Sequence, residues 1–186
     1  MICYDFKGGI GTSSRRVTAD GRWTVGTLVQ ANQGAREELV VAGMPIGREL
    51  ASEAKPLRPS SSILIFVGTD APLLPHQLKR LSRRCALGLA RTGSTSHTGS
   101  GDLFLAFSTA NRGALEAGAK GPRRADFIPD ESLNPLFEGV VQSSEEAILN
   151  ALVAGRQMVG YRGHVVEGFP SERLPEFLRR FGRSSA

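Results

Sequence analysis

The stretch Ser62-Ile63-Leu64-Ile65-Phe66-Val67-Gly68-Thr69-Asp70-Ala71-Pro72-Leu73-Leu74-Pro75 decides the fold. Its continuous apolar run, residues 63–67, is typical of a strand that is covered on both faces. The preceding residues 51–61 mix charged side chains, two prolines and a serine run without periodicity, which predicts an exposed flexible loop. A buried strand is therefore expected to emerge directly from a loop at Ser62.

The segments before this strand predict a mainly antiparallel sheet. Residues 3–6 and 23–30 are short apolar segments separated by glycine-rich turns, and residues 39–41 are a further candidate strand. Gly8, Gly9 and Gly11 resemble a phosphate-binding loop only superficially, because no Lys-Ser/Thr pair follows them. We interpret these glycines as tight turns.

The segments after this strand predict helices and one more strand. A helix is expected over residues 74–91, and the apolar run 103–107 predicts a second strand after a Ser/Thr/Gly-rich loop at 92–101. Residues 112–134 are polar and irregular.

Two helices are expected towards the C-terminus. The S-x-x-E pattern of Ser143-Ser144-Glu145-Glu146 predicts the start of one helix. The last helix is expected over 174–181, with Ser171 as its cap and Gly182 as its stop. Strands early and in the middle, with helices centrally and late, predict an α+β layered sandwich.

Length and composition limit the class of protein. The 186 residues, 40% of them hydrophobic, suit a single domain over 1–186. No apolar run is long enough to cross a bilayer, and the first residues do not resemble a secretory signal, so we expect a cytoplasmic protein without a membrane partner. Cys3 and Cys85 are expected as buried reduced thiols. The three histidines lack metal-ligand spacing, so neither a metal nor a cofactor is expected.

The basic charge raises nucleic-acid binding as one alternative. The formal net charge is +5 and the pI is about 9.8. The clearest basic cluster, Lys79, Arg80, Arg83 and Arg84, alternates with apolar residues at helical spacing, which favours a solvated helix face. No aromatic residues interleave with it as a base-stacking platform would require, so we expect no nucleic-acid partner.

Ser62 is the candidate nucleophile. Cleavage of the Ser61-Ser62 bond would leave a hydroxyl and a new α-amino group together at a rigid strand end. A free α-amino group has a pKa of about 7.7 to 8.0, so it can act as the base that a serine hydroxyl needs. The alternative, a polar end of a loop, is the commoner explanation of Ser60-Ser61-Ser62 when composition alone is considered.

The junction resembles that of a known family. Ser62 opening an apolar strand that leads into Thr69-Asp70-Ala71-Pro72-Leu73-Leu74-Pro75 is similar to the self-processing serine aminopeptidases of the L-aminopeptidase/D-esterase and β-peptidyl aminopeptidase family. Similar agreement extends through residues 3–12, 28–32, 99–102 and 106–111, and so covers nearly the whole chain.

The resemblance implies a fold and a division of the chain. The fold is an αββα sandwich resembling N-terminal-nucleophile hydrolases, with different strand connectivity. Residues 1–61 would form the end of the first product chain, with a processing loop at 51–61, and residues 62–186 would form the second. Family members carry a further N-terminal segment that includes a catalytic tyrosine, so we expect this chain to lack part of the sandwich and of the substrate pocket.

The resemblance also implies the site. The nucleophile falls on Ser62, its supporting serine and acid on Ser100 and Asp102, and the oxyanion donor on Asn32. Residues two apart on a strand point to the same side, so Ser100 and Asp102 can converge. Considered alone, S-G-D is more often a capped loop or a strand entry, and Asn32 before Gly34 is more often a turn residue. Thr69 and Asp70 are interpreted as structural.

The expected activity is hydrolysis of N-terminal residues from small peptides, amides or esters, through a Ser62 acyl-enzyme formed after autoproteolysis. The family further implies a homo-oligomer, namely a homotetramer. Ser61 replaces the glycine that family members usually carry before the nucleophile, which predicts slow or absent self-cleavage. The rival hypothesis is a catalytically inactive remnant that acts as a protein-binding module.

Overall fold

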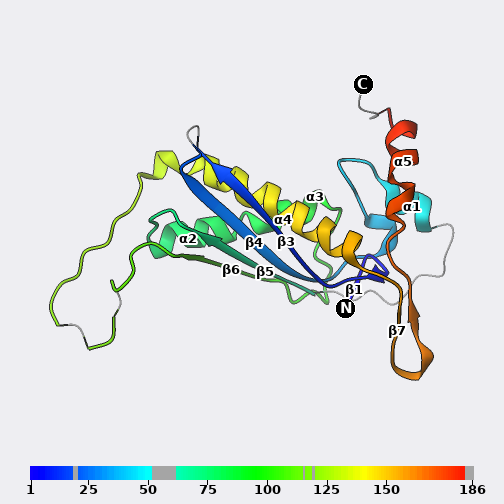
Figure 1. Cartoon of the computed structure of the whole chain (residues 1–186), viewed down its shortest axis with the longest axis horizontal. Coiled ribbons are helices and arrows are strands. Elements are labelled where there is room, and N and C mark those ends of the chain that lie inside the picture. The colour runs from blue at the N-terminus through cyan, green and yellow to red at the C-terminus, as the bar shows by residue number, and fades with distance from the viewer. Residues whose placement is uncertain (19–20, 52–61, 115, 119, 183–186) are drawn as a thin grey trace.

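A four-stranded sheet in the order β3-β4-β5-β6 is the centre of the molecule (Figure 1). The computed structural model describes residues 1–18, 21–51, 62–114, 116–118 and 120–182. The strands are β3 (Ile10–Val17), β4 (Trp23–Asn32), β5 (Ser62–Thr69) and β6 (Leu103–Ser108). β4 pairs antiparallel with both β3 and β5, whereas β6 runs parallel to β5. β5 is therefore a central strand, paired along both edges.

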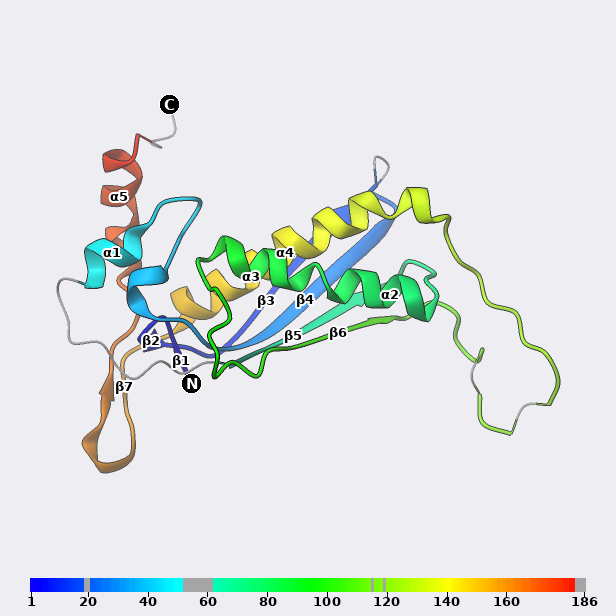
Figure 2. The same cartoon turned by 180° about the vertical axis from the view of Figure 1, so that it is seen from behind.

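Three helices cover one face of this sheet (Figure 2). They are α2 (Pro75–Ser82), α3 (Cys85–Arg91) and α4 (Asn134–Ala154). The core forms where they meet the sheet, and it includes the fully buried Ile63, Ile65 and Val67 of β5 and the equally buried Leu136 and Ile148 of α4. The α+β class is thus confirmed.

The other face of the sheet is open in the described part of the chain. Side chains on β5 alternate between buried and half-buried, so Leu64 and Phe66 point to this open face. The prediction of a strand covered on both faces is therefore wrong for this chain, because helices pack against one side only. Five apolar side chains on the open face are 39% to 52% exposed, namely Ile10, Leu28, Leu103, Leu105 and Phe107.

Smaller elements gather at the end of the sheet where β5 begins (Figures 1 and 2). They are the hairpins β1 (Ile2–Cys3) with β2 (Phe6–Lys7) and β7 (Met158–Val159) with β8 (Val165–Val166), and the helices α1 (Ile46–Ala51) and α5 (Leu174–Arg180). Short 3-10 helices occupy Arg36–Glu38, Asp130–Ser132, Tyr161–Gly163 and Ser171–Arg173. At the opposite end, the chain between β6 and α4 extends away from the sheet (Figure 1).

The helix expected to start at Ser143 begins nine residues earlier, at Asn134. Pro135 occupies its first turn, where a missing backbone N–H costs nothing. Ser143 and Ser144 are buried in mid-helix, and the Ser143 hydroxyl lies 2.6 Å from that of Thr27. These serines serve close packing against the sheet and α3, so the capping-box prediction is wrong.

Three other boundaries differ from the predictions. The helix expected over 74–91 breaks at residues 83–84 into α2 and α3, where the Arg84 guanidinium packs 3.8 Å from the Phe137 ring centroid. Residues 39–41 form no strand, because Val41 makes only an isolated bridge to Met44. The last helix is preceded by a 3-10 turn, so Arg173 rather than Ser171 is its N-cap, while Gly182 follows its end with a positive φ of 65°.

Gly8 and Gly11, near the N-terminus, allow close packing rather than tight turns. Gly11 lies within β3, and none of Gly8, Gly9 and Gly11 has a positive φ. A Cβ on Gly8 would lie 2.4 Å from the Ala31 carbonyl oxygen, and one on Gly11 would lie 1.9 Å from that of Ala147. The prediction of tight turns is corrected accordingly, because side chains at Gly8 and Gly11 would force neighbouring backbone apart.

Candidate active site

Ser62 is the first residue of β5 and faces the open side of the sheet. It stands directly opposite Asn32, the last residue of β4, in the antiparallel register. Directly opposed residues point to the same face, so both side chains are presented together. The Ser62 hydroxyl oxygen accepts a hydrogen bond of 3.1 Å from the Gly101 N–H.

Ser100, Gly101 and Asp102 lie beside Ser62 because β6 is parallel to β5. The register pairs Leu64 with Leu103, which places the residues just before β6 next to the start of β5. Asp102 Oδ1 accepts hydrogen bonds from the Ser100 hydroxyl at 2.5 Å and from the Ile63 N–H at 3.1 Å. Ser100 and Asp102 therefore converge as expected, although they belong to a loop and not to a strand.

Asn32 is held by the first strand of the chain. Its Oδ1 accepts a 2.9 Å hydrogen bond from the Ile2 N–H, and the neighbouring Gln33 carbonyl accepts one of 2.8 Å from the Tyr4 N–H. Because the Ile2 N–H binds the amide oxygen, it fixes the orientation of the Asn32 side chain. Its amide group is thus a rigid part of the strand end that faces Ser62.

Sequence reasoning missed three contributors to this site. The Ser96 hydroxyl donates a 2.7 Å hydrogen bond to Asp102 Oδ2, the Gly101 N–H points at the Ser62 hydroxyl, and the Ile2 N–H holds Asn32. Two of these are backbone groups, which carry no sequence signal. For Ser96, the serine-rich composition of the loop was the available signal.

Ser61 and the other residues from 52 to 61 of the expected processing loop lie outside the described residues, whereas its first residue, Ala51, ends α1. The Ser61-Ser62 bond therefore stays a sequence-based prediction.

Thr69 and Asp70 act structurally at the other end of β5. The Thr69 hydroxyl donates to the Thr24 carbonyl at 2.7 Å, and Asp70 Oδ1 accepts a hydrogen bond from the Thr24 N–H at 2.7 Å.

The cysteines are buried thiols, as expected. Cys3 and Cys85 are both free, and burial raises the pKa of Cys3 to about 12 and that of Cys85 to about 11. Both thiols are therefore protonated near neutral pH. Among the described residues, no group of three or more His, Cys, Asp or Glu side chains is arranged to hold a metal ion.

The basic cluster on α2 and the following turn is partly occupied in internal contacts. Arg80 forms an ion pair of 2.7 Å with Asp130, and both Arg80 and Arg84 lie over the Phe137 ring. Gln77 and Arg80 together lower the pKa of the Asp130 carboxyl by hydrogen bonding and charge. Arg80 thus helps to attach the chain before α4 to α2, and Arg84 packs on α4 itself.

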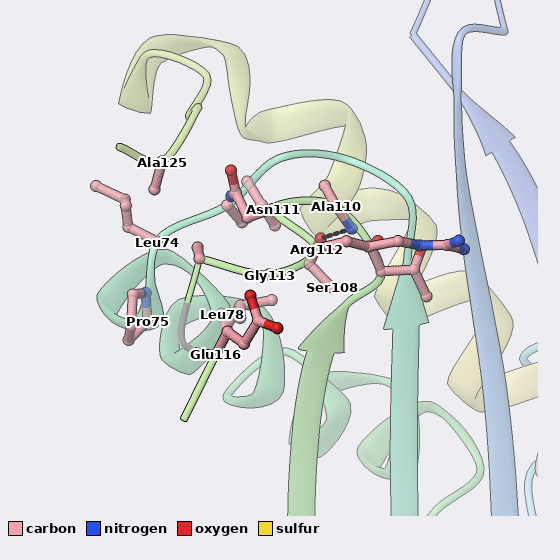
Figure 3. A pocket seen from close by; sticks show the side chains of 13 residues that line it. Leu74, Pro75, Leu78, Ser108, Ala110, Asn111, Arg112, Gly113, Glu116 and Ala125 are labelled. Atoms are coloured by element: carbon pink, nitrogen blue, oxygen red, sulfur yellow. Dashed lines mark hydrogen bonds between the residues drawn. The ribbon is translucent and has the colours of Figure 1, made fainter. Parts of the chain in front are cut away.

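A large cavity lies at the opposite end of the sheet from Ser62. Its volume is about 860 Å³, and its lining includes Leu74, Leu78, Ser108, Asn111 and Glu116 (Figure 3). Ser108 ends β6, whereas Ser62 begins the parallel β5, so the length of the sheet separates this cavity from the candidate nucleophile. The cavity is therefore no part of the site.

In the described chain, no helix has the length and apolar character needed to cross a membrane.

The sheet with its helices on one face superposes on a solved structure that has a variant of the Ntn hydrolase fold. The model of peptidase family S58 matches residues 1–166, and the chain belongs to this family. It is 46% identical to a β-peptidyl aminopeptidase of Sphingosinicella xenopeptidilytica, with 98% of this chain covered and 49% of the relative.

Solved structures show the same relationship. The chain superposes on the L-aminopeptidase D-Ala-esterase/amidase of Ochrobactrum anthropi, described as a prototype of the serine aminopeptidases with a variant of the Ntn hydrolase fold, with a TM-score of 0.88 at 40% identity. That match covers all of this chain and 51% of the other. A Burkholderia β-aminopeptidase gives a TM-score of 0.83 at 46% identity, with 100% and 52% covered. The chain thus spans about half the length of these relatives.

Proposed function

We propose that this chain carries the nucleophile of a self-processing serine aminopeptidase, with Ser62 as the attacking residue. The observation that supports this most directly is the meeting of three groups at the start of a central strand. These are the Ser62 hydroxyl, the Gly101 N–H that donates to it, and the Asp102 carboxylate that holds both Ser100 and the Ile63 N–H. The side chain of Asn32 faces the same point from β4.

Self-processing is the first step of this proposal. The Ser62 oxygen attacks the Ser61 carbonyl carbon, and the peptide C–N bond breaks as the Ser62 nitrogen takes a proton, which leaves an ester. Water then hydrolyses the ester, giving a carboxylate at Ser61 and a free α-amino group on Ser62. Nucleophile and base are then on the same residue.

Substrate hydrolysis follows the same chemistry. The Ser62 α-amino group accepts the hydroxyl proton while the oxygen attacks the substrate carbonyl, and the proton passes to the leaving amine or alcohol. Water then cleaves the acyl-enzyme. A donor aimed at the developing oxyanion contributes roughly 2.7 to 4 kcal/mol, and the Asn32 amide is the candidate for that task.

The Ser100–Asp102 pair would support these proton movements. A carboxylate oxygen accepts hydrogen bonds, so Asp102 accepts the hydrogen bond of the Ser100 hydroxyl and leaves the Ser100 oxygen lone pairs available. That oxygen can then accept a hydrogen bond from the Ser62 ammonium and keep it in place for proton transfer.

The substrates that we propose are small peptides, amides or esters. The related proteins are named β-peptidyl aminopeptidase and L-aminopeptidase D-Ala-esterase/amidase, which agrees with cleavage beside an N-terminal acyl residue. We further propose a cytoplasmic homo-oligomer, a homotetramer by resemblance to the family.

Intact-mass analysis tests the proposal. The purified chain should yield two fragments, one ending at Ser61 and one beginning at Ser62, and incubation with an aminoacyl p-nitrophenyl ester should add one acyl mass to the second. Ser62→Ala should abolish both signals, while Ser14→Ala, an exposed serine on β3, should retain them.

Failure of cleavage alone is resolved by Ser61→Gly, which removes the backbone restriction at that position. The decisive test is Ser61→Gly carried in a chain extended by the N-terminal half that the longer relatives possess. If that protein neither cuts itself nor hydrolyses aminoacyl amides, the aminopeptidase proposal is wrong.

A further inference from the structure

The loop that carries Ser100 and Asp102 is anchored to the segment after β4. The Glu38 carboxylate accepts the Ala35 N–H at 2.9 Å, lies 2.5 Å from His97 Nε2 and lies 3.5 Å from the Thr95 hydroxyl. The Val40 N–H also donates to the Thr92 carbonyl at 2.9 Å. Both sides of residue 96 are thus attached to the same acidic side chain.

Ser96, between these two anchors, has a left-handed backbone conformation. Its φ is 51°, a region that costs a non-glycine residue roughly 1 to 2 kcal/mol. Such a conformation persists where the surroundings determine it, and here it directs the Ser96 hydroxyl to Asp102 Oδ2 at 2.7 Å. The strained residue is therefore the one that contacts the acid of the site.

Both oxygens of Asp102 are held from different directions. Oδ1 accepts from Ser100 and from the Ile63 N–H, while Oδ2 accepts from Ser96. The terminal torsion of an aspartate is broad and weakly restrained by itself, so contacts on one oxygen alone leave the carboxylate free to rotate. The bond to Ser96 removes this freedom.

We infer that Ser96 is a positioning residue of the catalytic site, acting through Asp102. Glu38 supports it by fixing Thr95 and His97 on either side. The consequence is a Ser100 hydroxyl kept in one orientation relative to Ser62. This inference rests on the proposed function, since a positioned Ser100 matters only if Ser62 reacts.

Two substitutions at Ser96 separate its hydroxyl from its backbone. Ser96→Gly removes the hydroxyl and relieves the left-handed strain, whereas Ser96→Ala removes the hydroxyl and keeps the strain. Both are expected to lower kcat for aminoacyl p-nitroanilides by about 10- to 100-fold, which corresponds to one lost hydrogen bond to a charged group, with KM unchanged. Thr98→Ala, which removes an exposed hydroxyl from the same loop, should leave kcat and KM unchanged. A Ser96→Gly protein with parental kcat would overturn the inference, because the role would then be purely one of backbone shape.

A second measurement does not depend on turnover. With ¹³C-labelled aspartate, the Asp102 carboxyl carbon and the Ile63 amide should both shift in Ser96→Gly, because the Ile63 N–H binds Oδ1 and the Ser96 hydroxyl binds Oδ2 of the same carboxylate. Neither resonance should move in Thr98→Ala. Unchanged Asp102 and Ile63 resonances in Ser96→Gly would refute the contact. If Ser62→Ala retains the full rate, the proposed function fails, and the resonances still decide whether Ser96 holds Asp102.

Discussion

Alanine at Gly11 should destabilise the fold, whereas alanine at Gly9, two residues earlier, should not. Gly11 is the point where β3 approaches α4, and its Cβ would lie 1.9 Å from the Ala147 carbonyl oxygen and 2.8 Å from the Ala151 nitrogen. Backbone atoms cannot rotate away, so β3 and α4 must separate by about 1.5 Å to reach the 3.4 Å of an ordinary contact. A Cβ on Gly9 meets no atom within 4 Å.

The two substitutions should change the free energy of unfolding in opposite directions. Overpacking typically costs about 1 to 3 kcal/mol, and a clash between two backbones belongs at the upper end, so Gly11→Ala should lower the free energy of unfolding by about 3 kcal/mol or more. Gly9→Ala should raise it by about 0.4 to 1 kcal/mol, because alanine restricts the unfolded chain. For a chain of this size, 1 kcal/mol corresponds to roughly 2 to 4 °C in Tm.

The assay is urea and thermal unfolding followed by circular dichroism. A Ser62→Ala background keeps every chain uncut, so the two glycine variants differ from their parent at one position only. A Gly11→Ala protein within about 0.5 kcal/mol of its parent would refute the close packing of β3 on α4.

Three further predictions concern the site, the core and pH. Asn32→Ala should lower kcat by roughly 10²- to 10³-fold, while Gln30→Ala, on the same strand and face, should not; equal effects would exclude an oxyanion role for Asn32. Thr27→Val breaks the buried 2.6 Å contact with Ser143 and should cost about 1 kcal/mol in unfolding, with a positive coupling to Ser143→Ala in a double-mutant cycle; strict additivity would show that the hydroxyls do not interact. Burial raises the pKa of Cys85 from 9.0 to about 11, so the thiol's contribution to stability is complete below pH 9 and is lost as the pH rises toward 11. The urea midpoints at pH 8 and pH 10 should therefore differ less in Cys85→Ala than in the parent protein.

The apolar segments were sufficient to predict β4, β5 and β6, but not the edge strand β3. β3 reads Ile-Gly-Thr-Ser-Ser-Arg-Arg-Val and carries almost no hydrophobic pattern. One of its faces is open, and the other meets α4 through Gly11 and through Arg15, which contacts Gln142 at 3.1 Å. Polar and small contacts replace apolar ones there, so periodicity has little to detect.

The residues of the candidate site could be proposed from the sequence, but the strand register that brings them together could not. Resemblance gave Asn32, Ser62, Ser100 and Asp102 as candidates, and the structure brings all of them to one end of the sheet. The register between β5 and β6, which places Gly101 against the Ser62 hydroxyl, depends on the crossover through α2 and α3. No local pattern specifies such a register, because it is a property of the folded sheet.

The strand order has a consequence for the two pieces that cleavage before Ser62 would create. The cut would divide the sheet between β4 and β5, its two middle strands, while α4 from the second piece lies across β3 and β4 from the first. The β4-β5 ladder of backbone hydrogen bonds and the packing of α4 on β3 and β4 would therefore both join the two pieces. Each piece alone would expose a long strand edge, so we expect the two pieces to stay associated after the cut.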